Sequence, residues 1–406
     1  MNEKKAPEIR FKGFEDDWEQ RKLGDIVKRI TRKNENMESS LPLTISAQYG
    51  LIDQNEFFDK RIASSDISEY YLVRKGEFAY NKSTSNDAPW GAIKRLDRYE
   101  KGVLSTLYIV FRILDESRTD SNYIATYYDT NLWHGDVQAI AAEGARNHGL
   151  LNIAPDDFFK TTVLMPQDVN EQRLIGRYFT KLNDLITLHQ RKLEKLKIVK
   201  KSMLENCFPK NGEKIPKFRF AGFTDDWEQR KYSDVIKLVS GQDFPPSQYN
   251  EDGYGIPYLT GASCIYNGHT VAVRWTPEPR CIAEKGDTVL VCKGSGYGAI
   301  AVVDQEKAHI ARQFMTLKAQ DKVLDKVFNY YLLHTVIEAI KSDARGLIVG
   351  IARDAVLNQS VFIPSLDEQV KIGKYLANLD NLITLHQRKV DKLNNIKKSM
   401  LKLMFV

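Results

Sequence analysis

The chain has 406 residues, of which 42% are hydrophobic and 28% charged, a balance that is typical of folded proteins and excludes a largely disordered chain. Its 59 basic and 53 acidic residues leave a net charge of +6, which suits a nucleic-acid partner but also many proteins that bind none. The four cysteines have no Cys-x-x-Cys spacing, so the sequence predicts neither a disulfide framework nor a zinc site. The N-terminus has no apolar signal core and the chain has no apolar run long enough to span a membrane, so we expect a cytoplasmic protein.

A box of sixteen residues near the N-terminus occurs a second time in the middle of the chain. Residues 7–22 are PEIRFKGFEDDWEQRK and residues 216–231 are PKFRFAGFTDDWEQRK, with 12 of the 16 positions identical. The octapeptide LITLHQRK also occurs twice, at residues 185–192 and 382–389. The order is therefore box, variable segment and helix, followed by the same three parts again. This order indicates a duplicated half-protein rather than an array of short repeats.

The variable segments, residues 23–165 and 232–362, differ in sequence but share weak landmarks. We pair the following residues of the two segments: Pro42-Leu43-Thr44 with Pro257-Tyr258-Leu259, Lys75-Gly76-Glu77 with Lys285-Gly286-Asp287, Asn81-Lys82 with Cys292-Lys293, Tyr127-Tyr128 with Tyr330-Tyr331, and Ala145-Arg146 with Ala344-Arg345. Alternating side chains such as Phe78 and Tyr80 predict short strands, and residues 325–341 predict a helix. Each segment is thus expected to be a mixed α/β domain, with one fold carrying two different surfaces.

Two long helices are predicted at residues 171–204 and 368–401, because apolar residues recur there at intervals of three and four. The apolar stripe of the first helix consists of Ile175, Phe179, Leu182, Ile186, Leu193, Leu196, Val199 and Met203, and that of the second consists of Ile372, Leu376, Leu379, Ile383, Val390, Leu393, Ile396 and Met400. At about 1.5 Å per residue, each helix is roughly 50 Å long. A narrow stripe on a helix of this length favours a partner helix over a globular surface.

Antiparallel packing of the two helices would give an internal pseudo-two-fold axis and a self-complementary contact. The residues expected at this contact are Leu182, Ile186, His189, Leu196, Leu379, Ile383, His386 and Leu393. The two histidines would approach each other at the axis. A polar residue that fixes the register is favoured there over a metal site, because two ligands rarely hold a metal. The basic residues that follow are interpreted as a solvated face: Arg191, Lys192, Lys195, Lys197, Lys200 and Lys201.

Each motif that suggests catalysis lacks the context that the chemistry needs. The glycine-rich run 294–298 is followed by the strand-like run 299–303, whereas a phosphate loop must open a helix, so we expect a hairpin loop. Asp87-Ala88-Pro89-Trp90 resembles the Asp-Pro-Pro-Tyr box of amino-methyltransferases but lacks its second proline. Pro155-Asp156 has no Glu-x-Lys partner of a nuclease centre. The sequence therefore predicts no catalytic residue and no metal site, and it favours a binding protein.

The duplicated layout resembles the specificity subunits of type I restriction-modification systems. The resemblance covers essentially the whole chain, in order, and depends on the boxes at 13–22 and 222–231 and on the helices that begin with Glu171-Gln172 and Glu368-Gln369. It implies two target-recognition domains joined by antiparallel helices, each domain reading one half of a bipartite, asymmetric site in double-stranded DNA. It also implies assembly with two methyltransferase (modification) subunits, which bind S-adenosylmethionine, and with restriction/translocase subunits, which use ATP and Mg²⁺. No cofactor is expected in this chain itself.

The expected fold class is α+β, with two mixed α/β domains joined by a coiled coil of two long helices. The first target-recognition domain, with its box, is predicted at residues 1–165 and the first long helix at 166–210. The second domain is predicted at residues 211–362 and the second long helix at 363–406. Two other functions remain open: a self-contained DNA methyltransferase or nuclease with an unrecognised site, and a coiled-coil scaffolding protein that never binds DNA specifically.

Polar loop residues beside strand ends are the candidates for DNA contact, because Arg and Lys suit guanine or phosphate and Asn suits adenine. The candidates are Asn81, Lys82, Ser83, Thr84, Asn86, Arg146, Asn147 and His148 in the first domain, and Lys293, Ser295, Tyr297 and Arg345 in the second. The pairs Lys82/Lys293 and Arg146/Arg345 lead this set, because they recur at matching landmarks.

Overall fold

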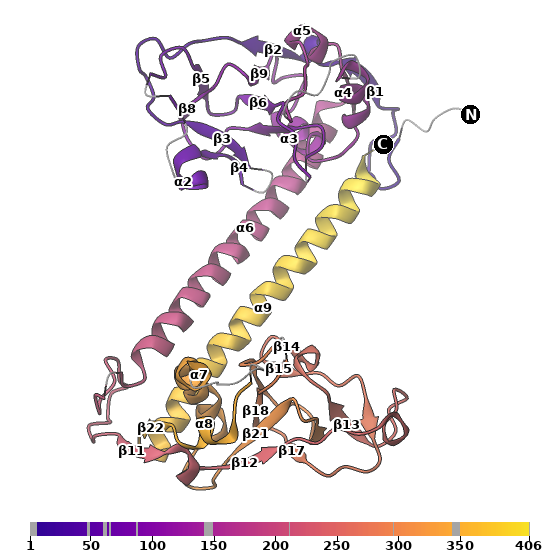
Figure 1. Cartoon of the computed structure of the whole chain (residues 1–406). Helices are drawn as coiled ribbons and strands as arrows, with labels where there is room; N and C mark the ends of the chain where they lie inside the picture. Colours follow the sequence, from indigo (N-terminus) through magenta and orange to yellow (C-terminus); the bar gives the residue numbers. More distant parts are fainter. Residues whose placement is uncertain are drawn as a thin grey trace. The chain divides into compact units, whose positions relative to one another are not determined.

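The computed structural model describes residues 6–46, 49–59, 63–64, 66–86, 88–141, 149–210, 212–294, 296–342 and 350–405. The chain divides into two compact units (Figure 1). Unit 1 comprises residues 1–189 and 389–406, and unit 2 comprises residues 190–388. Each unit therefore contains one box, one variable segment, the start of one long helix and the end of the other. None of the described helices is both long enough and apolar enough to cross a membrane.

Unit 1 is built around a four-stranded sheet of order β2-β9-β6-β7, with two-stranded sheets β1-β10, β3-β4 and β5-β8 beside it. Its strands are β1 (Glu19–Lys22), β2 (Val27–Ile30), β3 (Leu43–Ser46), β4 (Gly50–Asp53), β5 (Tyr71–Arg74), β6 (Phe78–Asn81), β7 (Ala92–Arg95), β8 (Lys101–Leu104), β9 (Ile109–Ile113) and β10 (Thr162–Met165). Its helices are α1 (Leu23–Ile26), α2 (Gln54–Phe58), α3 (Ser121–Tyr127), α4 (His134–Ala141), α5 (Pro155–Phe158) and the first part of α6 (Val169–Asn206).

Unit 2 repeats this plan with a larger sheet, of order β12-β21-β18-β19-β15-β14, and a four-stranded sheet β16-β13-β20-β17. Its strands are β11 (Glu228–Lys231), β12 (Ile236–Ser240), β13 (Ile256–Leu259), β14 (Ile265–Tyr266), β15 (His269–Thr270), β16 (Trp275–Thr276), β17 (Ile282–Glu284), β18 (Thr288–Val291), β19 (Ile300–Val302), β20 (Lys307–Ile310), β21 (Phe314–Ala319) and β22 (Ser360–Ile363). Its helices are α7 (Lys326–Ser342), α8 (Arg353–Leu357) and the first part of α9 (Leu366–Met404). The α+β class, the strands at Phe78 and Tyr80 and the helix near 325–341 are thus confirmed.

The repeated box closes each unit by pairing with the strand that precedes the long helix. In unit 1, β1 pairs with β10 so that Glu19 faces Met165, and in unit 2 β11 pairs with β22 so that Glu228 faces Ile363. The tryptophan of each box is buried in the core of its unit. The box is therefore duplicated because each unit needs the same strand and the same core residue.

An ion pair joins each box to the start of its long helix. Arg10 donates through Nε and Nη2 to the carboxylate of Glu171 at 2.7 and 2.8 Å, and Arg219 donates in the same way to Glu368 at 2.8 and 2.8 Å. Gln172, which follows Glu171, fixes α6 to the variable segment because its Oε1 accepts the N–H of Asp120. These contacts explain why Glu-Gln opens both long helices.

The two long helices pack antiparallel within each unit. In unit 1 the start of α6 contributes Phe179, Leu182 and Ile186 to a cluster that also contains Leu393 of α9 and Phe405, which directly follows α9. In unit 2 the corresponding cluster is formed by residues from the end of α6 and the start of α9, namely Leu196, Met203, Leu204, Ile372, Leu376 and Leu379. Ile383, His189 and His386 are half-buried, and the approach of the two histidines stays a prediction.

Two members of the predicted apolar stripes do not lie in these contacts. Val199 is 40% exposed and its repeat Ile396 is 37% exposed, so their assignment to the stripe was wrong. The helix period of 3.6 residues drifts relative to strict three-and-four spacing, and the next residue, Lys200 or Lys397, turns inward instead. An acidic side chain neutralises each of these lysines: Lys200 pairs with Asp380 at 2.6 Å, and Lys397 pairs with Asp129 at 2.7 Å. Lys200 is therefore not part of a solvated face.

A buried histidine is expected to make the stability of unit 2 depend on pH. His309 of β20 is fully buried; its Nδ1 accepts the N–H groups of Arg280 and Cys281, each at 3.2 Å, and Nε2 contacts the carbonyl of Gln242 at 2.7 Å. Burial lowers the pKa of His309 below its ordinary value. Because a histidine in the unfolded chain has a pKa of about 6.5, the stability due to the neutral ring is complete above that pH and is lost as pH falls toward the folded pKa.

We therefore expect the melting temperature of the chain to fall between about pH 7 and pH 5, and to fall less in the His309→Gln variant. Differential scanning calorimetry across this range, with both proteins in the same buffers, measures the difference. Parallel pH profiles for the two proteins would show that His309 does not titrate on unfolding.

Candidate nucleic-acid interface

The polar loops of unit 2 gather at one end of its central sheet, where β18 ends and β21 begins. We call this set edge 2; it comprises residues 241–244, 260–263, 292–294, 296–298, 311–313 and 350–353. The loops are joined by backbone hydrogen bonds, since Cys292 donates to the carbonyl of Gln313 at 2.7 Å and Ile351 donates to that of Cys292 at 2.8 Å. Gly241 donates to the carbonyl of Phe314 at 3.0 Å. Edge 2 is thus a set of loops held on a rigid sheet.

Unit 1 has the same arrangement where β6 ends and β9 begins, and we call it edge 1. It comprises residues 81–86, 105–108 and 149–153. Leu151 donates to the carbonyl of Lys82 at 3.0 Å, which matches the bond from Ile351 to Cys292 in edge 2. Thr84 donates to the carbonyl of Gly149 at 2.6 Å. The loops that the sequence singled out after β6 and β18 therefore occupy equivalent places in the two units.

Several predicted contact residues of edge 1 hold the loop itself. Oδ1 of Asn81 accepts the N–H of Ser83 at 3.0 Å, and the hydroxyl of Thr84 donates to the carbonyl of Gly149 at 3.0 Å. Nζ of Lys82 donates to the carbonyl of Ile153 at 3.3 Å, and burial lowers the pKa of this lysine. The remaining described candidates, Ser83 and Asn86, are exposed. Three others lie outside the described residues: Arg146, Asn147 and His148.

Edge 2 presents Lys293 to solvent, whereas Tyr297 is half-buried with Nζ of Lys341 5.7 Å from its ring centre. Ser295 and Arg345 lie outside the described residues. The run 294–298 joins the antiparallel strands β18 and β19, so the expected hairpin loop is confirmed.

The pairing of Lys82 with Lys293 is wrong by one residue. Isolated bridges join Ser83 to Leu150 and Lys293 to Gly350, so Ser83 is the residue equivalent to Lys293. Lys82 corresponds to Cys292, the other acceptor in the matching backbone bonds. In extended chain a shift of one residue turns the side chain to the opposite face, which is why one lysine is tucked against the unit and the other is exposed.

The exposed residues that the sequence reasoning missed lie in the turn before β21 and at the start of α8. Arg312 and Gln313 are exposed while the flanking Ala311 and Phe314 are buried. Nε of Arg312 pairs with Asp243 at 2.7 Å, and Arg353 donates to the hydroxyl of Ser240 at 2.6 Å. In the sequence, the feature that could have identified Arg312 and Gln313 is their position as a polar pair directly before the apolar run 314–317.

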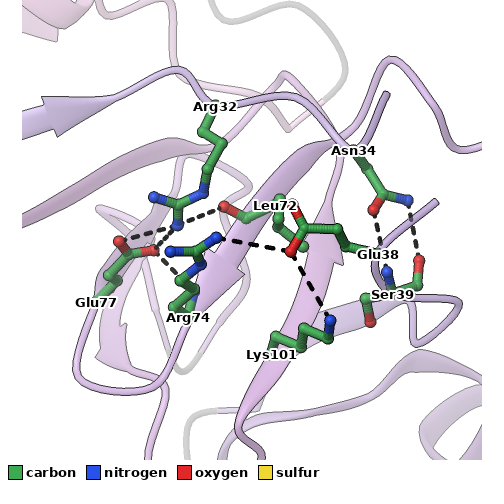
Figure 2. A network of polar contacts seen from close by, with 8 residues as sticks. All are labelled: Arg32, Asn34, Glu38, Ser39, Leu72, Arg74, Glu77 and Lys101. Atoms are coloured by element: carbon green, nitrogen blue, oxygen red, sulfur yellow. Dashed lines mark hydrogen bonds and ion pairs between the residues drawn. The ribbon is translucent and has the colours of Figure 1, made fainter. Parts of the chain in front are cut away.

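Away from edge 1, unit 1 contains a cluster of cationic side chains that pair with acidic side chains (Figure 2). Glu77 is buried and accepts Nη2 of Arg32 at 2.8 Å and the backbone N–H of Arg74 at 2.7 Å. Glu38 lies between Arg74 and Lys101, at 3.6 and 3.8 Å. Arg32 also donates to the carbonyl of Leu72, next to the pair formed by Asn34 and Ser39. This cluster fixes the turn after β5.

Unit 2 has an aspartate at the position of Glu77: Asp287 accepts the N–H of Glu284 at 2.9 Å. Its charge is balanced by Lys326 at 3.0 Å and Lys318 at 3.7 Å. The landmark pair Glu77 and Asp287 is therefore structural. Within the described parts of the chain, no group of three or more His, Cys, Asp or Glu side chains is placed to hold a metal ion.

Residues 224–395 match the family of type I restriction modification DNA specificity domains. Along its length the chain is similar to a protein of Methanocaldococcus jannaschii named as the specificity subunit of the type I restriction enzyme MjaX, with 24% identity over 409 residues, 96% of this chain and 93% of that protein. The MjaVIII specificity subunit of the same organism is 27% identical over 205 residues, which are 50% of this chain and 45% of that protein.

Solved structures show the same fold. The S subunit of a type I restriction-modification system from M. genitalium has a TM-score of 0.66 at 15% identity, with 99% of both chains covered. A chain from a structural study of the assembly of a type I R-M system has a TM-score of 0.50 at 18% identity, with 95% of this chain and 96% of that chain covered. The family match covers most of one repeat, and the box and long helix recur in the other. The second repeat therefore matches the type I restriction modification DNA specificity domain, and the chain along its length is similar to type I restriction enzyme specificity subunits.

Proposed function

We propose that the chain is the DNA-recognition subunit of a type I restriction-modification complex and that edges 1 and 2 each read one half of a bipartite, asymmetric site. The observation that carries this proposal is the contrast between frame and edges. The boxes, the ion pairs and the long helices are repeated nearly unchanged, whereas the edge loops differ in sequence between the two units. A repeated frame with different edges suits a site whose two halves differ.

The chemistry of the complex belongs to its partners in this proposal. Two methyltransferase subunits would bring S-adenosylmethionine, and restriction/translocase subunits would use ATP and Mg²⁺. This chain would contribute recognition alone, and the described loop residues of both edges offer backbone groups, amides and cations of the kind that contact DNA.

The methyltransferase subunits would bind a surface that occurs once in each unit. Leu185 and Leu188 are each 46% exposed on α6, and their repeats Leu382 and Leu385 are 42% and 46% exposed on α9. Both pairs lie within the repeated LITLHQRK. Identical exposed leucines in two units suit two copies of one partner, because the same surface is offered twice.

Replacing Leu185 and Leu188 with glutamine is expected to reduce the complex from two methyltransferase subunits to one, and replacing all four leucines to none. About 1.5 kcal/mol for each of two buried leucines corresponds to about a 160-fold loss of affinity at each surface. Native mass spectrometry of the purified complex measures the stoichiometry. Ile198→Gln is the control, because Ile198 is 67% exposed on the same helix but its repeat is Asn395. If the four-leucine variant still bound two subunits, the leucines would not be the surface that binds the methyltransferase.

The purified complex of this chain with its methyltransferase partner tests the function. We expect it to bind one duplex sequence from a random library more tightly than the rest, and we expect the chain alone to transfer no methyl group to DNA. Methyl transfer by the isolated chain would instead support a self-contained methyltransferase. Equal binding to all duplexes would support a scaffold without sequence recognition.

A further inference from the structure

The turn 311–313 of edge 2 is held by hydrogen bonds to three neighbouring segments of unit 2. Ala311 donates to the carbonyl of Leu259 at 2.8 Å, and Phe314 donates to the carbonyl of Ala311 at 2.9 Å, which closes the turn. The N–H of Arg312 is accepted by Asp243 at 3.0 Å, and the carbonyl of Gln313 accepts the N–H of Cys292. With Ala311 and Phe314 buried, this turn can present only the side chains of Arg312 and Gln313.

The side chain of Gln313 lies on two glycines. A Cβ atom on Gly261 would be 2.2 Å from Oε1 of Gln313, and one on Gly294 would be 3.8 Å from the same atom. Gly261 therefore leaves the space that the amide occupies. Among the described residues, no hydrogen bond involves the amide of Gln313, although the side chain is exposed beside Arg312. The amide is thus positioned by packing and keeps its donor and acceptor for a ligand.

The chemistry of a positioned glutamine amide matches one base. Its N–H donor and carbonyl acceptor complement N7 and the N6 amino group of adenine in the major groove. Arg312 stands next to it with Nε paired to Asp243, so its remaining N–H groups can donate to phosphate or guanine. Resting on the proposed function, we propose that Gln313 reads an adenine in the half-site recognised by unit 2 and that Gly261 positions its side chain.

The equivalent turn of unit 1 carries different chemistry in the same geometry. Tyr108 donates to the carbonyl of Ser105 at 3.1 Å, as Phe314 does to Ala311. Leu107 takes the place of Gln313 and is exposed. An apolar side chain cannot make the paired hydrogen bonds of an amide. The two units would therefore read different bases at corresponding positions, which an asymmetric site requires.

The test compares the sequence preference of the complete complex with wild-type chain and with Gln313→Ala, by competitive binding to a library of duplexes and by mapping methylated sites in cells. We expect Gln313→Ala to lose selectivity at one adenine of one half-site by about 5- to 160-fold, the range that corresponds to about 1–3 kcal/mol. The other half-site should not change. Gly261→Val should relax the same position although Gln313 is present, since its side chain must move.

The control is Gln229→Ala, because Gln229 is an exposed glutamine of the same unit outside edge 2. An unchanged motif in Gln313→Ala, or an equal loss of binding to all sequences, would overturn the role of Gln313 while leaving the proposed function intact. A wild-type complex with no preferred sequence would instead remove the proposed function, and the inference with it.

Discussion

Replacing Arg219 with alanine is expected to lower the free energy of unfolding by about 3–5 kcal/mol, because the charge of Glu368 would stay buried without a partner. Glu368 is 1% exposed, and both of its oxygens accept hydrogen bonds from Arg219 at 2.8 Å. Arg219 also donates to the carbonyl of Asp225 at 2.6 Å within the box, so its contacts with Asp225 and Glu368 together tie the box to α9. The Glu368 pair raises the pKa of Arg219, which therefore stays charged at any ordinary pH.

Urea denaturation of the full chain measures this loss, and Arg10→Ala should cause a similar one in unit 1. Lys285→Ala is the control, because it breaks the exposed pair between Lys285 and Glu306 and should change stability little. If Arg219→Ala lowered the free energy of unfolding no more than this control, the pair of Arg219 with Glu368 would not secure the box to the helix.

The sequence alone predicts the parts of the fold that have a period or a repeat. The strand at residues 78–81 carries aromatic side chains at every second position, and the helices at 169–206 and 366–404 carry apolar residues at helical spacing, so local patterns specify them. The duplication gives the order of the parts directly. The Glu-Gln pairs at both helix starts were visible as a repeat, but their arginine partners lie more than a hundred residues away and only the fold brings them together.

The pairings between the two variable segments were wrong where they relied on identical residue types rather than on equivalent backbone positions. Asp120 caps α3 by accepting the N–H of Tyr123, and Asp325 makes the same bond with Phe328. Counting from these caps, Tyr127 corresponds to Leu332, so the pairing with Tyr330 was wrong by two residues. A shared tyrosine carries no information on register, whereas the hydrogen bonds of a helix cap do.

The candidate site was predicted in outline but not in detail. The loop after β18 was identified because polar residues follow an apolar run. The turn 311–313 was not, because its proximity to Cys292 arises from the pairing of β18 with β21, and that pairing is a long-range contact. Exposed residues such as Arg312 and Gln313 leave no periodic signal, so the structure was needed to place them at the same edge.

Exchanging one variable segment is the other change with a large expected effect. If residues 232–362 are replaced by the corresponding segment of another specificity subunit, the boxes and long helices that form the frame remain. Edge 1 keeps its loops, since all of them come from residues 81–153. The half-site read by unit 1 should therefore persist unchanged, while the half-site read by unit 2 should be replaced entirely.

Sequencing that detects methylated bases, in cells carrying the chain with its methyltransferase partners, tests the division into frame and edges most directly. The account predicts a two-part motif for the natural chain and a motif with one new half and one retained half for the exchanged chain. A motif in which both halves change, or neither does, would contradict it.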